Sequence, residues 1–242
     1  MKICYYTTRG PVRDMNQDGV YVNGLASMDT AEPEETSADG GLFAVVDGMG
    51  GVAGGEVAAA LILEGLNGLR DEQPSAGALE RGLLRIQRAL RDKPGRFHHM
   101  GAALAGVWLG GESLAFNCGD CRAYLWRSGF LEKITHDHSL VQELYDNGAI
   151  DEEEMRFHPR KNILTSALSA DDPDPQIFCA PVSPRKGDKF LIMSDGLWEC
   201  LSIAELENCM GEPPALAAAK LKKLIWEKKA RDNASFIIVD LD

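Results

Sequence analysis

Residues 42–51 read LFAVVDGMGG, an apolar run that ends in an aspartate and a series of glycines. Residues 190–197 read FLIMSDGL and repeat the order of apolar run, aspartate and glycine. Short apolar runs bounded by turn residues are typical of strands buried on both faces. Each stretch would therefore place a carboxylate at the rim of the core, Asp47 in the first and Asp195 in the second. The glycine that follows lets the backbone turn sharply and approach a ligand closely.

Two further aspartates adjoin expected strands. Asp18 precedes residues 19–22, and Asp232 precedes the apolar residues 234–239. An aspartate at a strand end is also a common turn residue, which explains any one of the four equally well. Four together favour a cluster, in which the mutual repulsion of the carboxylates requires a compensating cation. Ligands that are all oxygen favour Mg²⁺ or Mn²⁺ over zinc or copper.

The hydrophobic pattern of the whole chain predicts strands in the middle and at both ends, with helices in two blocks. This order differs from the regular alternation of strands and helices in a parallel α/β protein. We therefore expect one α+β domain over residues 1–242, with a largely antiparallel sheet system covered by helices. Residues 23–40 are acidic and rich in small residues, which predicts an exposed loop. The expected strands cover residues 3–8, 19–22, 42–46, 101–109, 113–118, 122–126, 131–134, 189–193 and 234–239, and the expected helices cover 56–69, 77–90, 138–147, 203–210 and 214–228.

The composition limits the class of protein. The chain has 242 residues, of which 45% are apolar, and a formal net charge of −12. This charge argues against a nucleic-acid or anionic-membrane binder, either of which needs a basic face. No apolar run approaches the ~20 residues that span a bilayer, and the N-terminus lacks the features of a signal peptide. We therefore expect a cytoplasmic protein.

The cysteines and two histidines carry no clear metal pattern. Six cysteines are scattered along the chain, which does not indicate a disulfide framework. Cys118 and Cys121 form a C-x-x-C pair, without the second pair or the histidines that a structural zinc site requires. We interpret them as small buried residues near a strand end, with a redox pair as the alternative. His136 and His138 are interpreted as turn residues rather than metal ligands.

Seven segments, in order along almost the whole chain, resemble the signature segments of the metal-dependent protein phosphatases of the 2C type. More narrowly, they resemble the small bacterial members of that family. Any one segment is a weak signal, but seven in order are highly specific. The segments are GPVRDMNQD (10–18), FAVVDGMGG (43–51), NCGDCRAY (117–124), THDHS (135–139), NILTSAL (162–168), DKFLIMSDGL (188–197) and DNAS (232–235).

The resemblance implies a β-sandwich of two antiparallel sheets, flanked by helices on both outer faces in four layers, with a two-metal centre between the sheets. It implies that Asp47 bridges two Mn²⁺ or Mg²⁺ ions and that Asp195 and Asp232 complete the ligands of one of them. The carbonyl of Gly48 would bind the other ion, with Asp18 contributing directly or through water.

The resemblance also implies the reaction. A water activated by the two metals would attack the phosphorus of phosphoserine or phosphothreonine in line, without a phosphoenzyme intermediate. Arg13 matches the phosphate-binding arginine of the family, and its planar fork suits phosphate geometry. Asp120 matches a position that helps some bacterial members to hold a third metal. Residues 139–175 match the flap beside the active site, and their mixed polarity suits a mobile lid or substrate-contact segment, with a plain surface excursion as the alternative.

Several positions depart from the family pattern. Met49 stands where animal members carry a histidine proposed to protonate the leaving group, so the sequence does not identify the general acid. Residues 101–103 replace the usual Gly-Thr/Ser-Thr, Cys121 replaces a serine, and Ser169 stands where glycine commonly follows the Ala-Leu pair. None of these changes removes an expected metal ligand.

Two other functions are compatible with the sequence. A non-catalytic module that binds phosphoproteins would normally have lost metal ligands, and this chain retains them. A hydrolase of small phosphoesters could use the same metals and is poorly separated by sequence. If the chain is a serine/threonine phosphatase, which is the leading hypothesis, we expect a phosphorylated protein as substrate and an opposing serine/threonine kinase. We also expect a monomer, with neither nucleic acid nor membrane as a partner.

Overall fold

The fold is known from a computed structural model of the chain, which describes residues 1–50, 54–93, 99–171 and 174–242. The parts of the glycine-rich loop at 51–53 and of the expected flap at 172–173 lie outside the described residues.

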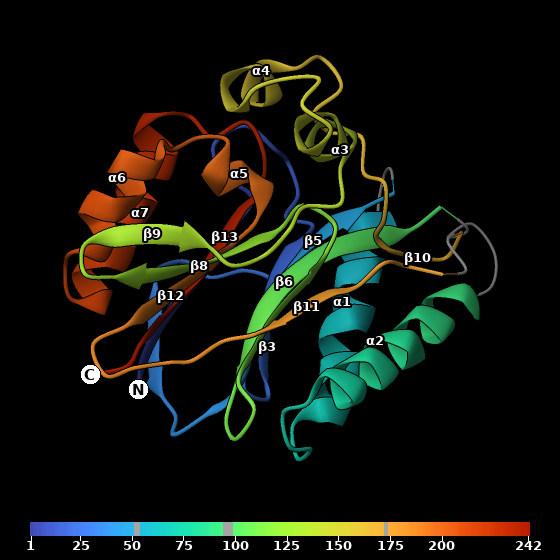
Figure 1. Cartoon of the computed structure of the whole chain (residues 1–242), viewed down its shortest axis with the longest axis horizontal. Helices are drawn as coiled ribbons and strands as arrows, with labels where there is room; N and C mark the ends of the chain where they lie inside the picture. Colours follow the sequence, from blue (N-terminus) through green and yellow to red (C-terminus); the bar gives the residue numbers. More distant parts are fainter. Residues whose placement is uncertain (51–53, 94–98, 172–173) are drawn as a thin grey trace.

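Two sheets stack face to face in the centre of the molecule (Figure 1). All pairings between the described strands are antiparallel. The first sheet has the strand order β4 (Glu34–Ser37), β1 (Lys2–Thr8), β13 (Ala234–Asp240), β12 (Lys189–Met193), β8 (Arg122–Arg127) and β9 (Phe130–Lys133). The second has the order β11 (Phe178–Pro181), β7 (Leu114–Cys118), β6 (Gly101–Leu109), β5 (Gly41–Met49), β2 (Asp18–Val22) and β3 (Leu25–Ser27), with β10 (Leu168–Ser169) also paired to β6.

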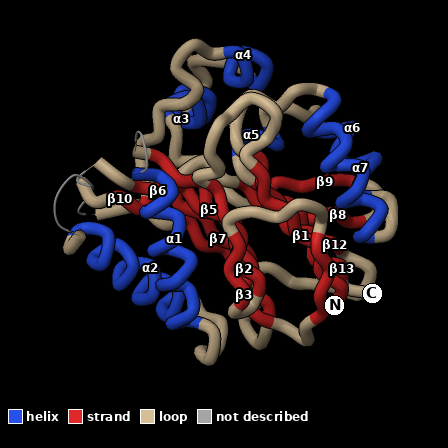
Figure 2. Tube along the Cα trace, turned by 180° about the vertical axis from the view of Figure 1, so that it is seen from behind, coloured by secondary structure: helices blue, strands red, loops and turns tan. Residues whose placement is uncertain are grey.

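Helices cover the outer face of each sheet, so the molecule has four layers (Figures 1 and 2). The second sheet is covered by α1 (Gly54–Leu66), the 3₁₀ turn η1 (Asn67–Leu69) and α2 (Ala76–Arg91). The first is covered by α6 (Ile203–Met210) and α7 (Pro214–Glu227). Three short helices lie at one end of the sandwich: α3 (Leu140–Asp146), α4 (Glu152–Phe157) and α5 (Asp195–Trp198). The expected α+β sandwich with helices on both outer faces is confirmed. None of the described helices has the length and apolar character needed to cross a membrane.

The side chains of β5 explain why its sequence is apolar without alternation. Phe43 and Val45 face the core between the sheets, whereas Leu42, Ala44 and Val46 face α1 and α2. Successive side chains of a strand point to opposite faces, and here both faces are buried. The strand therefore contributes to two cores at once.

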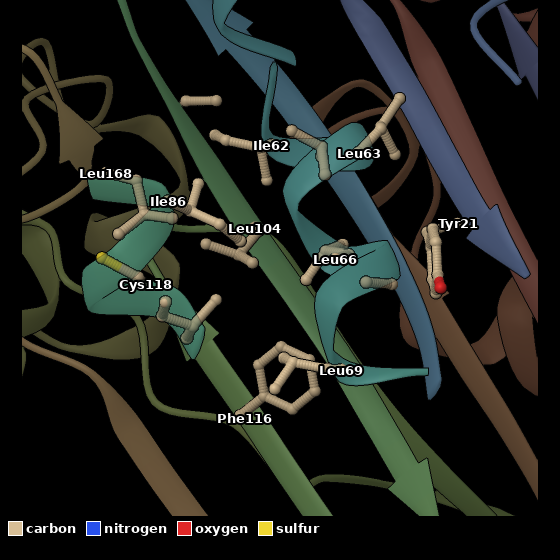
Figure 3. Close-up of a cluster of buried hydrophobic side chains, with 14 of the residues drawn as sticks. Tyr21, Ile62, Leu63, Leu66, Leu69, Ile86, Leu104, Phe116, Cys118 and Leu168 are labelled. Atoms are coloured by element: carbon tan, nitrogen blue, oxygen red, sulfur yellow. The ribbon is translucent and has the colours of Figure 1, made fainter. Parts of the chain in front are cut away.

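Apolar side chains of α1 pack on the outer face of the second sheet and form a second core there. Ile62, Leu63 and Leu66 project from α1 and gather with Leu104 and Phe116 of the sheet (Figure 3). All five side chains are at most 2% exposed. Full burial of a side chain of this size contributes about 1.5–3 kcal/mol, so this layer fixes α1 firmly on the strands beneath it.

Residues 23–40 correct the expectation of a loop, because they contain β3 and β4. Both are edge strands with largely exposed side chains, so they carry no alternating apolar pattern that sequence could reveal. A second correction concerns β5, which does not end at Val46. Its pairing with β6 continues through Asp47 and Gly48 to Met49. The short elements α4, α5, β10 and β11 were not expected either.

Candidate functional site

The core between the two sheets becomes polar at one end. In β2 and β5 the side chains that face it are Val20, Val45 and other apolar residues, until the same alternation reaches Asp18 and Asp47. These two aspartates lie directly opposite each other in the antiparallel pairing of β2 with β5. Like charges in that position are destabilising, so the pair needs a compensating positive charge.

An open pocket of about 700 Å³ lies at this polar end. All the residues predicted from the sequence except Asp18 line it, although they come from five separate parts of the chain. The predicted residues in its wall are Arg13, Asp47, Gly48, Asp120, Asp195 and Asp232. The structure thus brings the predicted residues together, with the second sheet contributing Asp47 and the ends of β12 and β13 contributing Asp195 and Asp232.

Asp18 lies beneath the pocket and is fully buried. Its Oδ2 accepts hydrogen bonds from the hydroxyl of Ser194 at 2.7 Å and of Ser235 at 2.8 Å. Its Oδ1 is buried and accepts no hydrogen bond from the described residues. Burial raises the pKa of Asp18 to about 7, against the lowering effect of the two hydroxyl groups.

The other carboxylates are also hard to ionise in the absence of a cation. Burial, followed by the charge of Asp232, raises the pKa of Asp195 to about 6. Burial raises the pKa of Asp47 well above its ordinary value, and the charges of Asp18 and Asp195 raise it further. Burial and then Asp195 likewise raise the pKa of Asp120. A cluster that disfavours its own negative charge is one that a divalent cation would stabilise.

The carboxylate oxygens of the site are suitable ligands for hard cations. Asp195 Oδ1, like Asp18 Oδ1, is buried without a hydrogen-bond donor among the described residues. A buried acceptor left unsatisfied costs about 1–3 kcal/mol, and more when it is charged. Oxygen atoms in this condition match the ligands that Mg²⁺ and Mn²⁺ prefer. The residues present therefore fit the predicted metal centre.

The ligands are nevertheless not assembled around one point. Among the described residues, no three Asp, Glu, His or Cys side chains already surround a common position as the ligands of one ion would. Instead, Arg13 Nη2 lies 2.6 Å from Asp232 Oδ2 and neutralises that carboxylate. A cation at Asp232 would have to displace the guanidinium, which would then be free to meet an anion in the pocket.

Two glycines are required by close backbone contacts beside the aspartates. A Cβ atom on Gly48 would collide with the backbone carbonyl groups of Gly55 and Gln17. A Cβ atom on Gly196 would collide with the carbonyl of Asn233. The glycine after each of these two aspartates thus allows a neighbouring backbone segment to pack directly against the site.

Asn233 is a site residue that was not predicted from the sequence. Its Oδ1 accepts a hydrogen bond from the backbone N–H of Gln17 at 2.9 Å. Its Nδ2 donates to the carbonyl groups of Arg9 and Met15. One side chain of the first sheet therefore holds the loop that carries Arg13. Its place directly after Asp232 in the matching DNAS segment was the available signal.

The loop that carries Asp120 is held by the segment around the two histidines. The N–H of Gly119 donates to Nδ1 of His138 at 3.1 Å, and the N–H of His138 donates to the Gly119 carbonyl. Asn117 bonds the backbone of both Gly119 and His136. Neither histidine lines the pocket, so their observed role is in the structure of this loop.

The C-x-x-C pair is divided between two cores. Cys118 packs in the core on the α1–α2 side of the second sheet, whereas Cys121 packs in the core between the sheets. Both side chains are buried, and neither is in a disulfide. This placement matches their interpretation as small buried residues at a strand end.

The comparisons with known proteins agree with this geometry. No protein-family model matches the sequence. The chain is 31% identical to the serine/threonine protein phosphatase PstP of Mycobacterium tuberculosis over 242 residues, which cover 96% of this chain and 43% of PstP. It therefore spans less than half the length of this curated relative.

Solved structures show the same fold. The crystal structure of the Mycobacterium tuberculosis serine/threonine phosphatase PstP/Ppp matches with a TM-score of 0.81 and 30% identity, covering 100% of both chains. The catalytic domain of PstP in complex with 2 manganese ions matches with a TM-score of 0.78 and 29% identity, covering 99% of each chain.

Proposed function

The chain belongs to the bacterial PPM, or protein phosphatase 2C-type, family of serine/threonine phosphatases, and on this premise we propose that it hydrolyses phosphoserine and phosphothreonine in proteins. The observation that carries the proposal is the pair of buried carboxylate oxygens without donors, Asp18 Oδ1 and Asp195 Oδ1. Asp195 lines a pocket whose wall also contains Arg13, and Asp18 lies buried opposite Asp47 of the same wall. Unsatisfied buried carboxylates fit cations, and an arginine beside them fits a phosphate group.

We propose that two Mn²⁺ or Mg²⁺ ions bind at this pocket. Asp47 would hold both ions, Asp195 and Asp232 would complete the ligands of one, and the Gly48 carbonyl and Asp18 would serve the other. Asp120 is placed in the same wall and could hold a third ion. When bound, the metal pair supplies a water of lowered pKa and positive charge for the phosphoryl oxygens.

The chain's own residues orient the substrate and the ligands. Ser194 and Ser235 hold one oxygen of Asp18, and the other oxygen, which has no donor among the described residues, would be available to a metal ion. Arg13 would exchange Asp232 for the phosphoryl oxygens and hold them with its planar fork. Asn162 and Leu164, from the proposed flap at 139–175, also line the pocket.

The proton for the leaving group must come from a limited set of groups. The described residues in the pocket wall include no histidine, lysine or tyrosine, and Met49 occupies the position of the animal histidine. The alcohol leaving group would therefore take its proton from an aspartic acid of the pocket or from water. These are the remaining candidates for the general acid, which the sequence did not identify.

Activity with a defined substrate tests the proposal. The purified protein should release phosphate from a phosphothreonine peptide with Mn²⁺ and should stop when a chelator is added. Asp195→Asn should lower kcat/KM by more than about 100-fold, because it weakens a direct metal ligand. The matched control is Asp39→Asn, an exposed residue outside the pocket. Equal turnover by Asp195→Asn and the unchanged protein would contradict the metal assignment.

The same assay separates the other functions. Tight phosphopeptide binding without metal-dependent turnover would favour a non-catalytic phosphoprotein-binding module. Faster hydrolysis of sugar phosphates or nucleotides than of phosphopeptides would favour a small-molecule phosphoester hydrolase.

We further propose a cytoplasmic monomer whose substrates come from an opposing serine/threonine kinase. None of the six cysteines is in a disulfide in the described structure, and each is buried or half-buried, as expected for a protein of a reducing compartment. Sedimentation of the purified chain would test the monomeric state.

A further inference from the structure

A second hollow, of about 510 Å³, adjoins the metal pocket on the outer side of the loop that joins β1 to β2. Asp14 and Met15 line both hollows, so the two meet at this loop. We call the second hollow the side groove. Six of the residues that line it carry its chemical character: Arg9, Asp14, Met15, Asp29, Glu56 and Trp226.

The side groove is acidic. Asp14, Asp29 and Glu56 are all exposed, and none of them forms an ion pair with the part of the chain that the structure describes. Arg9 is the single cationic side chain among the described lining residues. Three exposed carboxylates against one guanidinium leave the groove with a negative field, which attracts lysine and arginine side chains.

The groove also offers an aromatic surface. Trp226 is 43% exposed, with its indole N–H 3.5 Å from the hydroxyl of Tyr6. The wall beside it already holds one lysine in the same manner: the Lys222 ammonium lies 5.7 Å from the centre of the Tyr6 ring and pairs with Glu32. A ring together with a carboxylate is a suitable site for a cationic side chain. Trp226, Asp29 and Glu56 line the same groove, and no ion pair or cation–π contact joins any of the three to a lysine or arginine of the described residues.

We propose that the side groove binds the substrate polypeptide next to its phosphorylated residue and selects chains with a lysine or arginine there. The inference rests on the proposed phosphatase function and specifies its substrate class. The phosphate would go to the pocket with Arg13, and the basic residue would go to the groove beyond Asp14 and Met15. Opposite charges at adjoining sites would thus fix the direction in which the chain is bound.

A peptide series tests the proposal. Phosphothreonine peptides that differ only in one lysine, moved stepwise through the four positions on each side of the phosphothreonine, are compared with a peptide that carries glutamine instead. Lysine on one side should raise kcat/KM by about three- to tenfold, as expected for one exposed ion pair assisted by an aromatic ring. Lysine on the other side should have no effect.

Matched variants locate the effect. The double variant Asp29→Asn/Glu56→Gln should lose the preference for lysine, whereas Asp39→Asn/Glu64→Gln should keep it. The second pair removes the same charge from exposed positions outside both hollows, and Glu64 lies on the same helix as Glu56. Asp29→Lys/Glu56→Lys should reverse the preference toward a peptide with glutamate at the selected position. All variants should hydrolyse p-nitrophenyl phosphate, which has no flanking residues, at the unchanged rate.

The outcomes are distinguishable from failure of the proposed function. Absence of any metal-dependent hydrolysis, including that of p-nitrophenyl phosphate, would overturn the phosphatase proposal. The groove is then still tested by the affinity of the labelled peptides, measured by fluorescence anisotropy. Equal affinity and turnover for the lysine and glutamine peptides would overturn the groove proposal. A lysine preference that persists in Asp29→Asn/Glu56→Gln would overturn it as well.

Discussion

At the scale of single residues, the site depends on how Asp18 is held. Its carboxylate is fully buried, and one of its oxygens accepts hydrogen bonds from the hydroxyl groups of Ser194, directly after β12, and Ser235, in β13. Ser194 also accepts the backbone N–H of Ser235 at 3.0 Å. One hydroxyl group thus ties together β12, β13 and the aspartate of the opposite sheet.

Removing that hydroxyl group should weaken both the fold and the site. Ser194→Ala should lower the free energy of unfolding by about 1–3 kcal/mol, because it leaves buried polar groups without a partner. Urea denaturation of the metal-free protein measures this change. Ser37→Ala, on the exposed strand β4, is the control and should change stability little. A wild-type urea midpoint for Ser194→Ala would contradict the structural role of the hydroxyl group.

Arg13 should bind phosphate through the planar geometry of its guanidinium group as well as through its charge. Arg13→Ala should lower kcat/KM for a phosphopeptide by about 10- to 100-fold, the value of a charged, paired hydrogen bond to phosphate. Arg13→Lys should recover only part of this loss, because an ammonium group cannot make the two parallel bonds. Steady-state kinetics at saturating Mn²⁺ separates the two variants. Full recovery by lysine would show that charge alone matters.

At the scale of elements, the close approach of backbones positions the site. Gly196, in the first turn of α5, lies against the carbonyl of Asn233. The Asn233 side chain in turn bonds the backbone of Arg9, Met15 and Gln17. The start of α5, the turn before β13 and the loop between β1 and β2 therefore form one connected unit.

A methyl group at Gly196 should disturb this unit. Gly196→Ala should cost about 1–3 kcal/mol of stability through overpacking, and it should weaken Mn²⁺ binding because the Asp232–Asn233 turn must move. Gly68→Ala is the matched control, since nothing lies within 4 Å of the added atom. Thermal denaturation with and without Mn²⁺ measures both effects. Equal behaviour of the two variants would contradict the close packing inferred here.

At the scale of the whole molecule, the sequence predicts the framework and most of the site. The apolar runs at β5, β6 and β12 are recognisable because both of their faces are buried. The edge strands β3 and β4 are not, since exposed side chains carry no periodic signal. The ion pair between Arg13 and Asp232 could not be predicted either, because it joins residues far apart in sequence through side chains that are free to rotate.

The carboxylate cluster should give the metal-free protein an unusual pH dependence. Folding raises the pKa of Asp18 to about 7 and of Asp195 to about 6, so the folded state binds more protons than the unfolded chain between about pH 4 and 7. Stability should therefore fall as pH rises through this range. His138 acts in the opposite sense, because burial lowers its pKa.

A comparison of variants isolates the contribution of the cluster. Urea midpoints in the presence of chelator should fall more steeply between about pH 4 and 7 for the unchanged protein than for Asp195→Asn, which lacks one of the titrating groups. Saturating Mn²⁺ should remove most of the change in midpoint over this pH range in the unchanged protein. Parallel pH profiles for the two proteins in chelator would contradict the raised pKa values.

The central claim is that the polar end of the core between the sheets is a two-metal centre. The most direct measurement is anomalous scattering from a crystal soaked in Mn²⁺. We predict two strong peaks about 4 Å apart, as in two-metal hydrolases, within reach of Asp47, with Asp195 and Asp232 on one ion and Arg13 released from Asp232. A pocket without anomalous peaks, in which Arg13 still pairs with Asp232, would contradict the account.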